Sequence, residues 1–120
     1  MEPLAGIRIV EATTNAAGPM ATGILADQGA DVIRIETVGA GDPARHVGGN
    51  RGGVSSYYST MNRNKRSLSA DLKNPALRKP IYELIGTADV FVQNSRPGAL
   101  ARYGFGYDDL HAAFPDLIYV

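Results

Sequence analysis

The residues best suited to binding a charged ligand lie in one basic segment, residues 62–73. Four of the twelve Lys and Arg residues fall in it, namely Arg63, Lys65, Arg66 and Lys73, although the net charge of the whole chain is zero. A local positive cluster on a neutral chain favours a small anionic ligand over an extended polyanion. Asparagines beside the cations and two nearby tyrosines favour a phosphate-bearing nucleotide. A solvated loop is the alternative.

A second group of candidate binding residues follows a predicted strand at residues 89–93. The turn at residues 94–98 would lie at the carboxyl end of that strand, where open α/β sheets bind ligands. Arg102 comes one helical turn after this segment and can point back towards the same place. A tight turn stiffened by Pro97 is the alternative interpretation.

The first β–α junction, residues 12–18, is a third candidate, because the amino end of a helix offers free N–H groups to phosphate. It lacks the three spaced glycines of a dinucleotide-binding turn. Glu36 does end the second predicted strand at about the distance expected for a ribose-binding acid. A dinucleotide site and a plain turn beside a solvated acid therefore both stay open.

Groups that could carry out chemistry are scarce. The segment at residues 53–57 lacks the second glycine of a nucleophile elbow, and His46 and His111 have no metal-ligand spacing. No catalytic or metal-ligating residue is predicted in this chain. The absence of cysteine excludes disulfides and fits a reducing compartment. Balanced charge argues against nucleic acid, and no apolar run approaches a membrane span, so we expect a cytoplasmic protein.

The hydrophobic pattern predicts an α/β fold with a Rossmann-like parallel sheet and flanking helices. Strands are predicted at residues 7–12, 31–36, 68–72, 89–93 and 117–120. Helices are predicted from Gly18 to Gly29, from Ser55 to Met61, from Asn74 to Ile85 and from Tyr107 to Phe114. The third of these either begins at Pro80 or kinks there, and the kink is favoured. Residues 38–53, rich in glycine, are predicted to form a flexible loop with almost no core residues. Because the chain stops within an apolar strand, we expect residues 1–120 to be the N-terminal portion of a longer domain.

In this order the segments resemble the N-terminal part of the class III coenzyme A-transferases. That family includes formyl-CoA and carnitine CoA-transferases and the related alpha-methylacyl-CoA racemases. The matching stretches are residues 4–11, 17–19, 25–36, 41–42, 62–68, 71–73, 88–90, 94–98 and 115–119. The Asn-Arg-Asn-Lys-Arg-Ser run and the Arg-Pro-Gly turn are the most specific of them.

The resemblance implies that coenzyme A lies along the carboxyl edge of the sheet. By position, the expected contacts are Ala16, Ala17, Ala70, Asp71, Leu72, Lys73, Asn94, Ser95, Arg96 and Arg102. It also implies that residues 62–67 partly shape the fold. Thr37 stands where many relatives have arginine or proline, which predicts the loss of one phosphate or adenine contact. Gln93 and Ser95 replace a commoner Glu-Asn-Phe pattern, which predicts a looser pocket wall.

For the parent protein, the resemblance implies transfer of coenzyme A between an acyl-CoA thioester and a carboxylic acid acceptor. The reaction would pass through an aspartyl covalent intermediate on a residue beyond this chain, in an interlocked homodimer that needs no metal, nucleic acid or membrane. Racemisation of an acyl-CoA is one alternative, and a non-catalytic nucleotide-binding module is another. The isolated chain is expected to be inactive.

Overall fold

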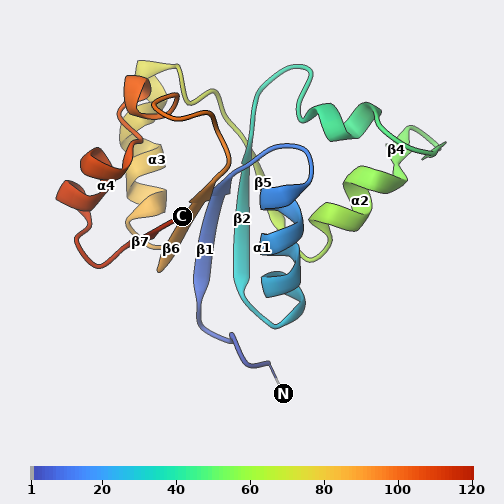
Figure 1. The fold of residues 1–120 in the computed structure, drawn as a ribbon, viewed down its shortest axis with the longest axis horizontal. Helices are drawn as coiled ribbons and strands as arrows, with labels where there is room; N and C mark the ends of the chain where they lie inside the picture. The colour runs from blue at the N-terminus through green and yellow to red at the C-terminus, as the bar shows by residue number, and fades with distance from the viewer. Residues whose placement is uncertain (1) are drawn as a thin grey trace.

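A five-stranded, fully parallel sheet forms the centre of the computed structural model, which describes residues 2–120 (Figure 1). The strand order is β5-β2-β1-β6-β7. The strands are β1 (Arg8–Ala12), β2 (Asp31–Glu36), β5 (Arg66–Ser69), β6 (Val90–Gln93) and β7 (Ile118–Tyr119). The predicted α/β fold with a parallel sheet is confirmed, and all strands therefore end at one common edge.

Helices flank the sheet on both sides: α1 and α2 lie on one side of the view, α3 and α4 on the other (Figure 1). They are α1 (Ala17–Asp27), α2 (Ser56–Asn62), α3 (Arg78–Ile85) and α4 (Tyr107–Ala113). Three short 3₁₀ helices occur in the connections: η1 (Pro43–His46), η2 (Pro75–Leu77) and η3 (Ala101–Tyr103). None of the helices in residues 2–120 is long and apolar enough to cross a membrane.

Alternation along the strands divides the core into two clusters. The larger cluster contains Val10, Ile33 and Phe91 from the sheet, packed with residues of α3 and α4 such as Ile85 and Leu110. The smaller cluster lies on the α1 side and consists of Ile9, Ala26, Ala30, Val32 and Val92. The next residues on this second face are charged rather than apolar, which has consequences for the site.

The glycine-rich segment contains more structure than the sequence indicated. Asp42 and Ala44 are buried, η1 forms at its centre, and β3 (Asn50–Arg51) pairs with β4 (Val54–Ser55) in a small antiparallel hairpin. The segment does contribute almost no core residues, as predicted, since Ala44 is the one buried apolar residue among residues 38–53. It is nevertheless attached to the sheet, because the Asp42 side chain pairs with Arg34 and accepts hydrogen bonds from main-chain N–H groups. Ser55 caps α2 as predicted, its Oγ accepting from the Tyr58 N–H at 3.1 Å.

Two predicted boundaries also need correction. The third strand, β5, begins at Arg66 and ends at Ser69, ahead of the predicted residues 68–72. A 3₁₀ turn at residues 75–77 precedes α3, so Pro80 lies in the first turn of α3 rather than at a kink within a longer helix. In a first turn the N–H that proline lacks has no intrahelical acceptor, so Pro80 costs this helix little.

The contact between α1 and α2 depends on Gly23. A Cβ on Gly23 would lie 2.9 Å from the main-chain carbonyl oxygen of Met61. We expect Gly23→Val to lower the free energy of unfolding by about 1–3 kcal/mol, because two backbones must separate. Urea unfolding measures this change. Ala21→Val, at an exposed position of the same helix, is the matched control and should cost only a few tenths of a kcal/mol in helix propensity. Equal losses in both variants would contradict the close packing.

Candidate functional site

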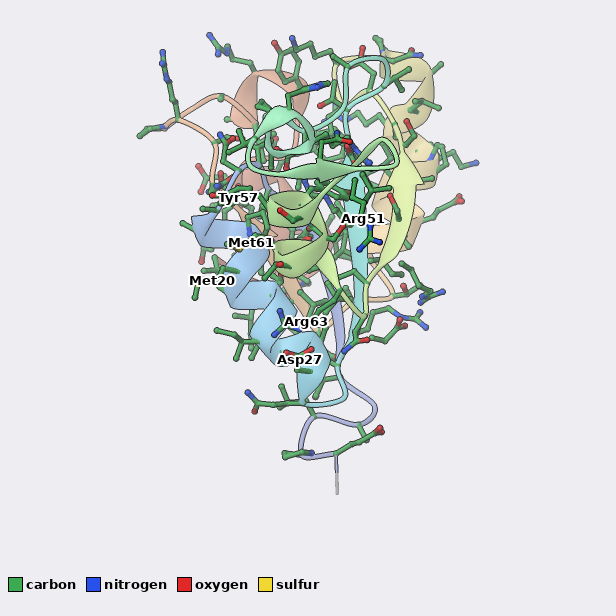
Figure 2. The ribbon with its side chains drawn as sticks, turned by 90° about the vertical axis from the view of Figure 1, so that its right-hand side faces the viewer. Met20, Asp27, Arg51, Tyr57, Met61 and Arg63 are labelled. Atoms are coloured by element: carbon green, nitrogen blue, oxygen red, sulfur yellow. The ribbon has the colours of Figure 1, made fainter. Side chains whose placement is uncertain are left out.

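Most of the basic segment pairs with acids of the protein itself. Arg63 forms an ion pair with Asp27 on the outer side of α1 and α2 (Figure 2), and its hydrogen bond lowers the pKa of Asp27. Arg66 pairs with Asp31 at 2.5 Å and lowers the pKa of that carboxyl in the same way. These two arginines therefore have partners within the protein, in agreement with the structural role that the resemblance implied for residues 62–67, and a direct role for them with an anionic ligand loses its support.

The third cation of the segment, Lys65, belongs to a buried ionic network on the α1 face of the sheet. Glu11 and Arg34 are direct partners in the register of β1 and β2, with Arg34 Nη1 at 3.4 Å from Glu11 Oε1. Lys65 Nζ approaches the same oxygen to 2.8 Å. All three side chains are at most 2% exposed. Burial lowers the pKa of Lys65, while the Glu11 carboxylate opposes that shift.

Neutral groups supply further hydrogen bonds to this network. Thr13 and Thr22 each donate a hydroxyl hydrogen bond to Glu11 Oε2, at 2.7 and 2.5 Å. Asn62 Oδ1 accepts from Arg34 at 2.8 Å and from Lys65 at 3.1 Å. Buried charges are tolerated only when they are paired and hydrogen-bonded in this way. The network therefore joins β1, β2, α1 and α2.

Asp42 extends the network from the sheet into the glycine-rich segment. Its carboxylate forms an ion pair with Arg34 Nη2 and accepts from the N–H groups of Ala44 at 2.8 Å and of Asn15 at 3.1 Å. Asn15 has a left-handed φ of 62°. One buried carboxylate thus holds both the segment after β2 and the turn between β1 and α1.

Glu36 completes the connection at the end of β2. Its oxygens accept from the Asp42 N–H at 2.8 Å, from two guanidinium nitrogens of Arg45, and from the Tyr58 hydroxyl at 2.8 Å. Arg45 lies over the Tyr58 ring, 3.9 Å from its centroid. The hydrogen bonds from Arg45, with those from Asp42 and Tyr58, lower the pKa of Glu36 to about 2. With four donors already bound, Glu36 has no free oxygen to offer a ribose, so the structure does not favour the dinucleotide alternative.

A cavity of about 350 Å³ opens at the carboxyl edge of the sheet beside this network. Its polar lining includes Arg34, Glu36 and Asp42, and its apolar lining includes Ile35 and Leu100. The other lining residues are Ala12, Thr13, Thr14, Thr37, Gly41, Ala70, Asp71, Leu72, Lys73, Ser95, Ala99, Arg102 and Tyr103. No cluster of three or more potential metal ligands occurs among residues 2–120. The arrangement can hold a ligand with both flat apolar and anionic parts.

Comparison with known proteins identifies the family. The family model described as CoA-transferase family III matches residues 4–120. The chain belongs to this family.

Similar proteins include several CoA-transferases. Human succinyl-CoA:glutarate CoA-transferase is 44% identical over 99% of this chain, and formyl-CoA:oxalate CoA-transferase of Rhodopseudomonas palustris is 43% identical over 96% of it. This chain spans 27% of each of these relatives. The crystal structure of Rv3272 from Mycobacterium tuberculosis superimposes with a TM-score of 0.89 at 37% identity, covering 98% of this chain and 33% of that one. A CAIB/BAIF family protein from Brucella suis also gives 0.89, at 38% identity, covering 98% and 32%.

Six of the ten coenzyme A contacts that the resemblance implied line the cavity of this family III chain, namely Ala70, Asp71, Leu72, Lys73, Ser95 and Arg102. The other four, Ala16, Ala17, Asn94 and Arg96, lie outside the cavity lining. Asn94 has a clear supporting contact, because its side chain accepts from the Thr14 N–H at 2.9 Å and donates to the Thr14 carbonyl at 2.8 Å. Asn94 therefore positions a residue that does line the cavity. Arg96 is exposed, and its contact with ligand stays a prediction.

The β–α junction predicted as a candidate, residues 12–18, contributes Ala12, Thr13 and Thr14 to the cavity lining. Sequence reasoning missed other lining residues, namely Ala99 and Leu100 before η3 and Tyr103 at its end. No signal in the sequence pointed to Arg34 and Asp42. One is an arginine within an apolar strand and the other an acid in a glycine-rich segment, and neither pattern indicates that the two residues pair with each other.

The low pKa of Glu36 makes a testable contribution to stability. Its folded-state pKa is about 2, against an ordinary value of 4.5, so the carboxylate stabilises the fold above that value. This stabilisation is lost as the pH falls from about 4.5 towards 2. We expect Glu36→Gln to unfold with a free energy about 2–3 kcal/mol below that of the unsubstituted chain near neutral pH, and the gap to shrink in acid.

Urea titrations over a pH series measure this gap. Asp116→Asn is the control, because Asp116 is exposed and should give a gap near zero at every pH. A gap for Glu36→Gln that stays constant into acid would show that the carboxylate is not held by these donors.

Proposed function

We propose that this chain is the coenzyme A-binding portion of a CoA-transferase that moves coenzyme A between an acyl-CoA thioester and a carboxylate. The cavity at the strand ends carries this proposal, because it combines apolar walls with free cations at the edge where α/β sheets bind nucleotides. The printed activities of similar proteins support it, since they name succinyl-CoA with glutarate and formyl-CoA with oxalate.

Different cavity residues would contact different parts of the nucleotide. Leu72 and Leu100 supply apolar surface against which an adenine can pack, and Thr14 lies at the amino end of α1. Lys73 and Arg102 are exposed cations in the same lining. Each hydrogen bond from such a cation to a phosphate contributes about 1.5–3 kcal/mol. Ala16, Ala17, Asn94 and Arg96 complete the proposed contact surface next to the cavity.

The chemical step needs a group outside this chain. The family resemblance supplies an aspartate, which forms the covalent intermediate and lies beyond residue 120. Racemisation would use the same nucleotide site, but the named relatives given above are transferases, which favours transfer. We also propose, from the family resemblance, that the parent is a homodimer, and that it meets its acyl-CoA and acid in the cytoplasm.

Removal of the Arg102 charge tests the nucleotide site. In the full natural chain we expect Arg102→Gln to raise KM for acyl-CoA about tenfold with little change in kcat, because a uniform binding contact is lost. Arg51→Gln is the control, since Arg51 lies on the β3–β4 hairpin (Figure 2) and outside the cavity lining. An unchanged KM for both Arg102→Gln and Arg96→Gln would count against nucleotide binding at this edge.

The division between binding and chemistry gives another prediction. Residues 1–120 alone should bind coenzyme A in calorimetry but show no thioester exchange with succinyl-CoA and glutarate, because the nucleophile is missing. The full natural chain should catalyse exchange with at least one acid from a panel of glutarate, citramalate and oxalate. Exchange by residues 1–120 alone would place the catalytic group within this chain and overturn the assignment.

A further inference from the structure

The cations of the chain fall into two sets with different surroundings. Six of the twelve form ion pairs with the protein's own carboxylates: Arg8, Arg34, Arg45, Arg63, Lys65 and Arg66. Within residues 2–120 the other six have no carboxylate partner, and three of these, Lys73, Arg78 and Arg102, line one groove of about 360 Å³. Half of the free cations are therefore concentrated at one place.

This groove adjoins the nucleotide cavity. The two share Leu72, Lys73, Arg102 and Tyr103 in their linings. The groove continues away from the sheet between η2 and η3, where Asn74, Pro75, Arg78, Ala101, Gly104 and Asp109 complete it. It forms a side branch of the cavity, open to a group that projects from a ligand bound there.

The charge balance differs between the two spaces. In the cavity three cations, Arg34, Lys73 and Arg102, stand against three carboxylates, Glu36, Asp42 and Asp71. In the groove three cations stand against Asp109 alone. The Asp109 carboxylate accepts from the Gly106 N–H at 3.2 Å at the start of α4. The groove therefore has an excess of positive charge, which favours the most highly charged part of a ligand.

The Arg78 side chain is held in place although it has no acidic partner. Its guanidinium lies over the Tyr82 ring at 5.5 Å from the centroid, and it packs directly on Gly104, where any Cβ would collide with it. Tyr82 in turn donates its hydroxyl hydrogen bond to the Gly104 carbonyl. Gly104 has a left-handed φ of 80°. This packing orders the guanidinium without neutralising it, which suits an arginine that binds an anion.

We propose that Arg78, with Lys73 and Arg102, binds a terminal phosphate monoester of the nucleotide, the 3′-phosphate of coenzyme A. Arg78 thereby distinguishes coenzyme A from 3′-dephospho-coenzyme A. The inference rests on the proposed function, since it assigns one end of the same ligand. A phosphate monoester carries up to two negative charges and projects from the ribose, so it fits a cationic side branch. The diphosphate is a linker within the ligand and belongs in the main cavity.

The test compares Arg78→Gln with the unsubstituted full natural chain in calorimetric binding of coenzyme A and of 3′-dephospho-coenzyme A. We expect Arg78→Gln to weaken coenzyme A binding about tenfold, as loss of one charge-assisted hydrogen bond would. Binding of the dephospho compound should stay within about twofold. Arg78→Lys, which keeps the charge, should restore part of the preference.

Lys79→Gln is the matched control, because it removes a neighbouring exposed charge of α3 that does not line the groove. Unchanged binding of the dephospho compound also shows that the variant is folded. Equal weakening of both ligands would overturn the proposal, because Arg78 would then contact the diphosphate or support the fold. Unchanged binding of both would overturn it as well. Failure of the unsubstituted protein to bind either ligand would instead contradict the proposed function.

Discussion

The buried ion pair between Glu11 and Arg34 constrains the rest of this structure. The two residues face each other in the register of β1 and β2, on the face covered by α1. A one-residue slip of β2 would move Arg34 to the opposite, apolar face of the sheet and separate it from Glu11. Removing one partner of such a pair typically costs about 3–5 kcal/mol, because a buried charge is left uncompensated. The pair thus specifies one register at the centre of the sheet.

The same network connects the core to the nucleotide cavity. Arg34 contacts Glu11 in the sheet and Asp42 in the glycine-rich segment, and Asp42 holds the turn that contains Asn15. Cations that shape the fold are thereby neutralised before a ligand arrives. Lys73 and Arg102, which line the cavity, have no acidic partner within residues 2–120. In the proposed function, the unpaired cations are therefore available to the phosphates of the ligand. The cations of the buried network are already paired with carboxylates and do not bind it.

The fold was largely accessible from the sequence, and the site only in part. Strands such as Asp31–Glu36 and the caps at Ser55 and Gly29 follow from local pattern and chemistry, so the parallel sheet and its ligand-binding edge were predictable. The partners of the charged residues were not. Lys65 looked like a ligand-binding cation because its acid, Glu11, is 54 residues away. Asp42 looked like a loop residue because its burial depends on Arg34, whose own orientation depends on the register of two strands.

The proposed nucleotide-binding edge would suit enzymes that differ in their acceptors. Relatives named for glutarate, citramalate and oxalate match this same segment at 44%, 38% and 43% identity. A segment common to proteins with different named acceptors is suited to hold the part of the substrate that they share, which is coenzyme A. Binding energy from that remote part can position the reactive thioester against groups elsewhere in the protein. In the proposed enzyme, the ionic network would hold the nucleotide-binding edge in one position. This matters because a nucleotide bound to a mobile edge would not fix the position of the thioester at its other end.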